Sequence, residues 1–131
     1  MADANRAARP LSPHLTVYRI IFRPQITSFS SIMIRVTGLA LMAGVLLAVW
    51  WLLAAAIGPE AFATANAVAT SWFGDLVFTL SMWAVWYHYL GGLRHLYWDA
   101  GKGLDIRTAE LLGWVCVFGS VVLTILTLIV I

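Results

Sequence analysis

Charged side chains are scarce in this chain. Lys, Arg, Asp and Glu together make up 11% of its 131 residues, whereas 62% are hydrophobic, and the mean hydropathy is +0.89. A water-soluble globular protein of this composition would expose large apolar patches, so we expect an integral membrane protein. The net charge is only +2 and the basic residues form no clustered face, so we expect no nucleic acid as a partner.

Cysteine and histidine are also rare. Cys116 is the only cysteine, and His14, His88 and His95 are the only histidines. One cysteine cannot form a disulfide within the chain, and no Cys or His group has the spacing of a zinc site. We therefore expect Cys116 to be a small buried apolar residue.

Long apolar runs are what the sequence does contain, at residues 31–57, 73–97 and 108–131. Each is long enough to cross a hydrocarbon core of roughly 30 Å, which takes about 20 helical residues. None alternates between apolar and polar residues as the strands of a membrane barrel do. The sequence predicts an all-α membrane protein with an N-terminal segment, residues 1–30, and a domain of three transmembrane helices, residues 31–131.

The distribution of charge predicts the orientation of these helices. The first connection, IGPEAFATANAVATS, carries Glu60 and no basic residue, and no charge follows Glu110. The basic residues lie before or just inside the first span and near the second connection: Arg6, Arg9, Arg19, Arg23, Arg35, Arg94, Lys102 and Arg107. By the positive-inside rule, the N-terminus and the second connection face the cytoplasm.

The N-terminal segment differs in composition from the rest. Pro10, Pro13 and Pro24 interrupt regular structure, and the arginines keep the segment in water or among lipid headgroups. Its length suits contact with a soluble partner at the cytoplasmic face. A tail that only anchors the chain to headgroups through its basic residues is the alternative.

The second span carries a stripe of unusual residues. On a helix, His88, Gly92, His95 and Asp99 fall within about 60° of one another, with Gly91 beside them. Ionisable residues inside a membrane are costly and usually mark a functional site. The glycines would admit either a neighbouring helix or a flat macrocycle. The histidines could bond another helix, relay protons or bind a metal.

Spacing limits the metal hypothesis. His88 and His95 project from one face about 10.5 Å apart along the helix axis, so they cannot lie on opposite sides of one iron. The first and third spans contain no histidine. A haem with two histidine ligands would therefore need its second ligand from another chain, while ligation by one histidine remains open.

The first span has a polar stripe of its own, with Thr27, Ser31, Arg35 and Gly38 on one helical face. Arg35 lies deeper than a headgroup anchor needs. It could extend back to the headgroups, or it could neutralise an anionic group inside the protein. A haem propionate or a quinone carbonyl would suit it, with the Ser31 hydroxyl as a second donor.

Three motifs together carry a family resemblance: RPLSPHLTVYR at residues 9–19, S-I-x-x-R-x-T-G at 31–38, and H-x-x-x-G-x-R-H-x-x-x-D at 88–99. In this order they resemble the larger (C-type) cytochrome b membrane anchor of succinate dehydrogenase, respiratory complex II. The resemblance covers essentially the whole chain. It implies that the three helices bundle with those of a second small anchor subunit in the bacterial inner membrane.

The resemblance also implies roles for individual residues. His88 matches an axial ligand of haem b, with the second ligand supplied by the other anchor chain. Ser31 and Arg35 match residues of the ubiquinone pocket. The surroundings of the haem would include Arg35, His95, Gly91 and Gly92. The family usually has a histidine where this chain has Ile34, which alters the propionate environment but leaves the axial ligand in place.

The function implied is that of an anchor subunit. Electrons from succinate would pass through a flavoprotein and an iron–sulfur subunit to ubiquinone, linking the tricarboxylic acid cycle to respiration. This chain lacks a flavin fingerprint and the cysteines of an iron–sulfur site, so it cannot oxidise succinate alone. The alternatives are a haem-free structural anchor and a small transporter or channel subunit. The latter is disfavoured because the charges gather at one membrane face.

Overall fold

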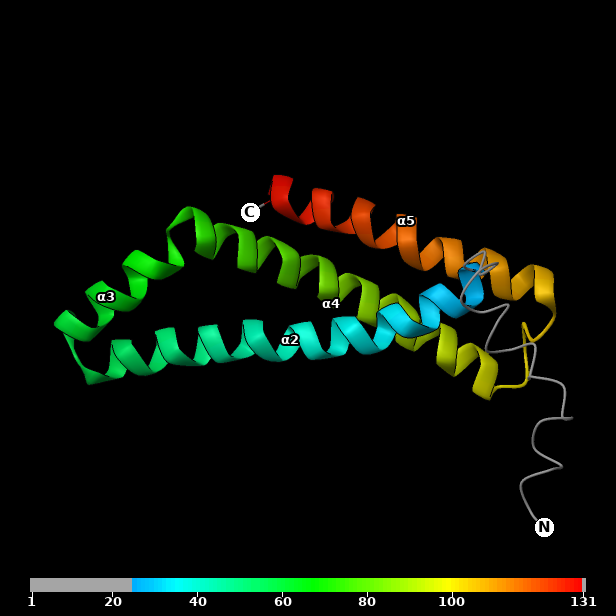
Figure 1. Ribbon diagram of the computed structural model, residues 1–131, viewed down its shortest axis with the longest axis horizontal. Coiled ribbons are helices and arrows are strands. Elements are labelled where there is room, and N and C mark those ends of the chain that lie inside the picture. The colour runs from blue at the N-terminus through cyan, green and yellow to red at the C-terminus, as the bar shows by residue number, and fades with distance from the viewer. Residues whose placement is uncertain (1–24, 131) are drawn as a thin grey trace, which may run out of the picture.

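The computed structural model describes residues 25–130, which are helical apart from short turns and contain no strand (Figure 1). Residues 1–24 and 131 lie outside this range, and with them the motif at 9–19, His14 and most of the predicted N-terminal segment. The helices are α2 (Ile26–Ile57), α3 (Pro59–Ala69), α4 (Trp72–Asp99) and α5 (Ile106–Val130). The prediction of an all-helical chain is confirmed for the described residues.

Two of these helices, α2 and α5, are each long and apolar enough to cross a membrane. The middle span meets the same test only when α3 and α4 are taken together, and these two helices are bent by 70° relative to each other. The structure thus supports two spans, and a third if α3 and α4 form one broken span. Several ionisable residues lower the hydropathy of α4: Asp75, His88, Arg94, His95 and Asp99.

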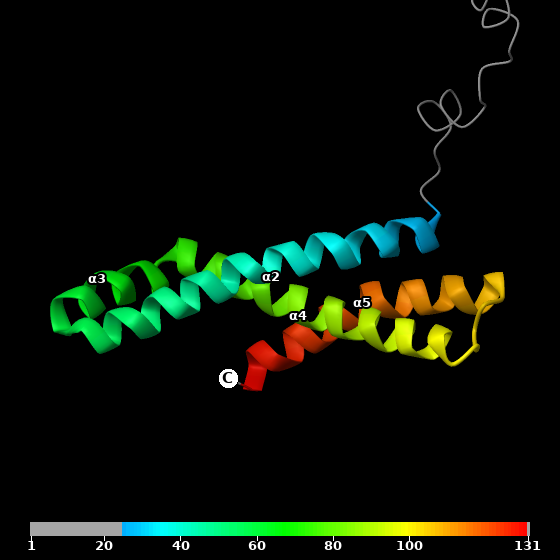
Figure 2. The same ribbon diagram turned by 90° about the horizontal axis from the view of Figure 1, so that it is seen from below.

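The first connection is itself largely helical, which the sequence analysis did not predict. Gly58, with φ of 149°, ends α2, and Pro59 then begins α3 at a position where proline is well tolerated. The side chain of Trp51 reaches α3, where its Nε1 donates a hydrogen bond to Asn66 Oδ1 at 3.3 Å. As a result, α3 folds back beside α2, and the two helices form a hairpin at one end of the molecule (Figure 2).

Small and polar side chains form the helix contacts, and large apolar side chains face outward. On α2 the buried positions Ser30, Thr37 and Gly44 recur every seven residues. Both α2 and α5 pack against α4, and Cys116 of α5 is buried as predicted. Small residues allow helices to approach closely where lipid offers no hydrophobic driving force, so this is the packing expected in a membrane.

Hydrogen bonds between side chains join α4 to α5. Trp83 Nε1 donates to Ser120 Oγ at 3.1 Å, and Trp86 Nε1 donates to Thr127 Oγ1 at 3.0 Å. These bonds fix the face that α4 turns toward α5. The opposite flank of α4, which carries His88, is left beside α2.

Candidate functional site

The imidazole ring of His88 lies against α2. Its Nδ1 is 3.1 Å from the backbone oxygen of Ile34, and Thr37 Oγ1 is 3.5 Å from the same nitrogen. A carbonyl oxygen can only accept, so this contact assigns a proton to Nδ1; in the neutral imidazole, Nε2 then has the lone pair that a metal requires. Histidines that bind metals are commonly held in this way, by donating their other ring N–H to a backbone carbonyl. No described residue forms a hydrogen bond with Nε2.

Gly38 of α2 makes room for this ring. A Cβ atom added at Gly38 would lie 3.2 Å from Cε1 of His88, closer than ordinary van der Waals contact. A larger side chain at this position would therefore push the imidazole away from the Ile34 carbonyl. The polar stripe predicted on α2 and the histidine stripe predicted on α4 thus meet at His88.

The two neighbouring glycines of α4 have different surroundings. Gly91 is buried, and a Cβ there would lie 2.6 Å from Cγ1 of Ile34, so Gly91 is where α2 and α4 approach closely. At Gly92 nothing lies within 4 Å of an added Cβ. Gly92, His95 and Asp99 are all exposed. The described residues therefore leave the surface of α4 next to His88 uncovered, with room at Gly92 for a flat macrocycle.

Ile34, where the family resemblance leads us to expect a histidine, has a defined place here. Its side chain packs on Gly91, while its backbone oxygen holds His88. The backbone of residue 34 therefore supports the candidate ligand whichever side chain stands there. The side chain of Ile34 adds an apolar group to the contact between α2 and α4.

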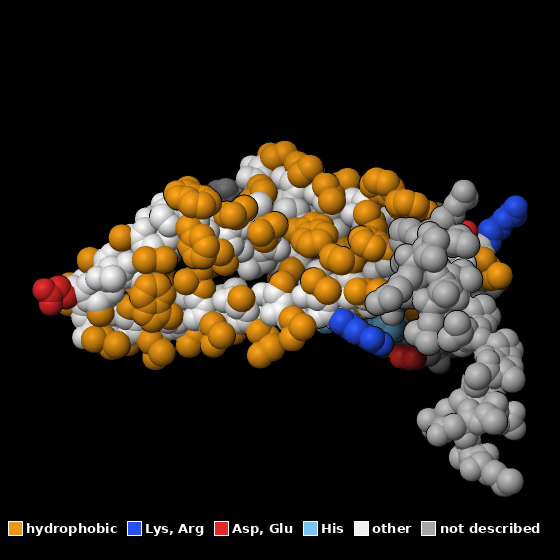
Figure 3. Space-filling view, in the orientation of Figure 1, with side chains coloured by type: hydrophobic (Ala, Val, Ile, Leu, Met, Phe, Trp, Pro, Cys, Tyr) orange, Lys and Arg blue, Asp and Glu red, His pale blue; other side chains and the backbone are white. Residues whose placement is uncertain are grey.

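Ser31 and Arg35 lie one turn apart on the flank of α2 near His88. Ser31 is half-buried and Arg35 is exposed. Figure 3 shows basic, histidine and acidic side chains close together at one edge of a surface that is otherwise mostly hydrophobic. Both side chains are therefore at least partly open to a ligand on the outside of α2.

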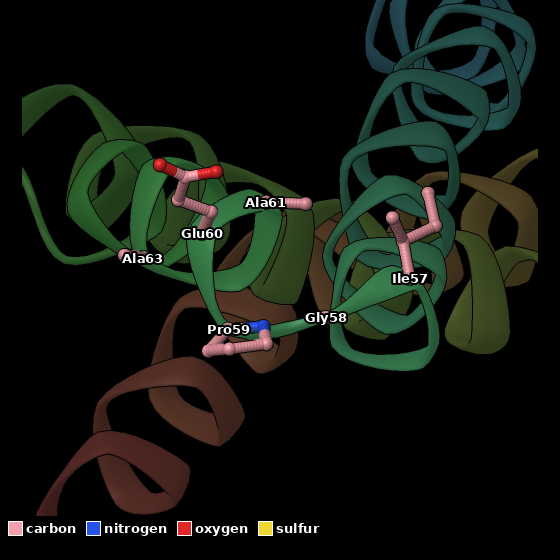
Figure 4. A pocket seen from close by; sticks show the side chains of 6 residues that line it. All are labelled: Ile57, Gly58, Pro59, Glu60, Ala61 and Ala63. Carbon is pink, nitrogen blue, oxygen red and sulfur yellow. The ribbon is translucent and has the colours of Figure 1, made fainter.

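A separate hollow of about 660 Å³ lies at the turn between α2 and α3. Figure 4 shows Ala61 pointing toward α2 and the carboxylate of Glu60 pointing away from Pro59. A single carboxylate lines this hollow, without other charged groups converging on it. Across residues 25–130, no group of three His, Cys, Asp or Glu side chains could hold a metal ion. His88 with its open surroundings is therefore the stronger candidate.

The sequence analysis did not predict a structural role for Arg94. It treated this arginine as a topology signal and as one position of a motif, yet only 2% of its surface is exposed. The helical period offered a clue, since Tyr87, Gly91 and Arg94 recur at i, i+4 and i+7, on the face that α4 buries. A charged residue on that face is unexpected, and its contacts are described below.

Known proteins resemble this chain over most of its length. Residues 5–127 match the model of the family described as succinate dehydrogenase/fumarate reductase transmembrane subunit. The chain is 55% identical to the succinate dehydrogenase cytochrome b556 subunit of Paracoccus denitrificans, over 99% of this chain and 97% of that protein. It is 39% identical to the subunit of the same name from Rickettsia conorii, over 90% and 89% of the two chains.

A more distant relative is the succinate dehydrogenase cytochrome b560 subunit of Reclinomonas americana, at 36% identity over 82% of this chain and 75% of that protein. The relatives belong to an enzyme complex in which a subunit of this kind anchors the assembly and does not carry the dehydrogenase site. The chain belongs to the succinate dehydrogenase/fumarate reductase transmembrane subunit family, as a b-type cytochrome subunit of complex II.

Proposed function

We propose that this chain binds haem b through His88 Nε2 and forms part of a ubiquinone site with Ser31 and Arg35. The observation that carries the proposal is the fixed imidazole. The Nδ1–H of His88 is directed at the Ile34 carbonyl, which leaves Nε2 free beside the open surface at Gly92. When bound, haem b supplies a one-electron redox centre at this position.

A second ligand to the haem iron would come from a second small anchor subunit in this proposal. His95 is the only other histidine among the described residues, and it lies two helical turns from His88 on the same face. The iron–sulfur and flavoprotein subunits dock on the side that carries these residues. In a bacterial inner membrane this is the cytoplasmic side, where the N-terminal segment of residues 1–30 also lies.

Ser31 and Arg35 act on the quinone head. The Ser31 hydroxyl donates a hydrogen bond to a carbonyl oxygen, and the Arg35 guanidinium stabilises the negative charge that develops as electrons arrive from the iron–sulfur subunit. His95, Gly91 and Gly92 shape the surroundings of the haem. A proton path across the whole membrane has less support, since no charged residue follows Arg35 in α2 or Glu110 in α5.

Haem ligation is tested by comparing two histidine variants of the purified complex. His88→Leu should abolish the b-type haem signal in a dithionite-reduced minus oxidised spectrum. His95→Leu is the matched control, since it removes an exposed histidine from the same face and should retain haem. A full haem signal in His88→Leu would show that His88 is not a ligand.

The quinone role is tested with Arg35→Leu. We expect quinone reduction to fall roughly 10²-fold, the usual cost of removing one donor to a developing negative charge. Succinate oxidation by a soluble artificial acceptor should change little. Arg107→Leu removes an exposed cation at the start of α5 and should leave both activities intact. An equal loss of both activities in Arg35→Leu would indicate failed assembly and count against the quinone role.

A further inference from the structure

Arg94 places a positive charge inside the helix bundle, close to the end of α4. Its guanidinium is almost fully buried, and neither Nε nor Nη2 has a hydrogen-bond partner among the described residues. Nη1 donates to Ser30 Oγ on α2 at 2.5 Å, and the guanidinium carbon lies 4.6 Å from the centre of the Trp98 ring. Ser30 is therefore the only described hydrogen-bond acceptor of a buried charge, a setting in which such a bond is strong.

Ser30 is held from several directions. It has no exposed surface, and its backbone oxygen accepts a hydrogen bond from the Tyr87 hydroxyl at 3.4 Å. On the α5 side, a Cβ added at Gly113 would lie 3.4 Å from Ser30 Oγ. Two side chains of α4 and a close approach by α5 thus converge on one residue of α2. These contacts fix both the position and the rotation of the start of α2.

The rotation of α2 determines where the proposed quinone residues point. Consecutive helical residues project about 100° apart, so Ser31 and Arg35 turn rigidly with Ser30. A rotation of about 20° would move side-chain atoms near the helix surface by roughly 2 Å. A misplacement of about 1 Å can cost a catalytic site roughly 10²-fold in rate. The contact between Arg94 and Ser30 can therefore change the orientation of Ser31 and Arg35 although Arg94 contacts neither the quinone nor these two side chains.

We propose that Arg94 is a positioning residue for the quinone site, which it orients through its hydrogen bond to Ser30. This proposal rests on the proposed function of Ser31 and Arg35. Arg94 does not bind the quinone, because its guanidinium is buried behind Ser30 and Trp98. The prediction specific to this arrangement is that changes at Arg94 and at Ser30 act through the same contact.

A double-mutant cycle on the whole complex tests this coupling. Arg94→Gln, Ser30→Ala and the double variant are compared for kcat/KM with a short-chain ubiquinone, for succinate oxidation by a soluble acceptor, and for haem content. Each single change should lower kcat/KM for the quinone about tenfold, and the double variant should be no worse than either. Arg94→Lys, which keeps the charge and a donor, should remain within about threefold of the native value.

Succinate oxidation by the soluble acceptor should stay within about twofold of native in all these variants. Haem content should fall less than kcat/KM for the quinone, because the Ile34 carbonyl lies nearer the helix axis than the Ser31 and Arg35 side-chain atoms and moves less when α2 turns. Arg107→Gln is the control for removal of one positive charge near the same end of the bundle, and it should leave kcat/KM unchanged. A double variant impaired about a hundredfold, the product of the single effects, would overturn the proposal. So would a parallel loss of all activities and haem, which indicates a purely structural role.

Arg35→Leu measured in the same series separates the two proposals. If it lowers quinone reduction while Arg94→Gln and Ser30→Ala do not, the positioning role is wrong and the quinone site stands. If Arg35→Leu leaves quinone reduction at the native level, the proposed quinone site fails, and the role assigned to Arg94 fails with it.

Discussion

Replacing Gly91 by alanine changes a close contact between α2 and α4. The added methyl carbon would lie 2.6 Å from Cγ1 and 2.7 Å from Cδ1 of Ile34. Both distances are far below van der Waals contact, so either the Ile34 side chain must turn or the helices must separate. Separation would also move the Ile34 carbonyl that holds His88. We expect Gly91→Ala to lower both the stability of the helix pair and the retention of haem.

Two energy terms set the magnitude. Overpacking of a tight contact costs roughly 1–3 kcal/mol, and the better helix propensity of alanine offsets about 1 kcal/mol of this. Ile34→Ala removes both clashing atoms, whereas Cβ of Ile34, at 3.9 Å, is already in ordinary contact. The new methyl at position 91 then fills part of the space that Ile34 vacates. The double variant should therefore be more stable than the sum of the single effects by about 1–2 kcal/mol.

The free energy of unfolding can be measured on the detergent-solubilised complex by titration with sodium dodecyl sulfate, followed by tryptophan fluorescence. Haem per protein serves as the second readout. Gly92→Ala is the matched control one residue along, because its methyl meets nothing within 4 Å. Additive losses in the double variant, or an equal loss of unfolding free energy in Gly91→Ala and Gly92→Ala, would refute the contact geometry.

Three further outcomes follow from the structure. Hydrogen bonds from the Thr108 side chain and backbone N–H lower the pKa of Asp105 below its usual 3.8. The Asp105 cap therefore stabilises the start of α5 fully at pH values above 3.8, and this stabilisation is lost as the pH falls through the lowered pKa. A chemical-shift titration of the Asp105 side chain with its midpoint at or above 3.8 would contradict this. Gly92→Leu should reduce haem content while leaving the free energy of unfolding within about 0.5 kcal/mol of native, as measured by haem per protein and the same detergent titration. Trp83→Phe breaks the 3.1 Å bond to Ser120 and should cost about 0.5–1.5 kcal/mol in that titration, less when Ser120 is already alanine.

Hydropathy alone predicts α2 and α5, because each consists of one long apolar run. It places the start of the first span at residue 31, whereas α2 begins at Ile26, since hydropathy marks where a helix becomes apolar and not where it begins. The same measure fails for α3, which is short and mixed in composition. The sequence Gly58-Pro59-Glu60 contains the local signal for a helix start, with proline in the first turn and an acidic residue beside it.

Helical periodicity predicts which residues of the candidate site share a face of one helix, but not their contacts with another helix. Spacing places His88, Gly92 and His95 on one face, and the structure keeps them there. Spacing cannot show which ring nitrogen of His88 carries the proton, because the Ile34 carbonyl that fixes it belongs to another helix. Spacing also cannot show that Gly91 contacts Ile34 while Gly92 stays open, because this depends on how α2 crosses α4.

The length of α2 has a consequence for lipid-soluble molecules. At 1.5 Å per residue its 32 residues measure about 48 Å, well beyond a hydrocarbon layer of about 30 Å. The uncharged stretch 36–57 spans about 33 Å and suffices to cross that layer. The first turns of α2 then stand among the lipid headgroups, with Arg35 at the boundary. In the proposed quinone site, a molecule with a polar head and a long isoprenoid tail would meet Arg35 at this depth, entering sideways while its tail stays dissolved in the bilayer.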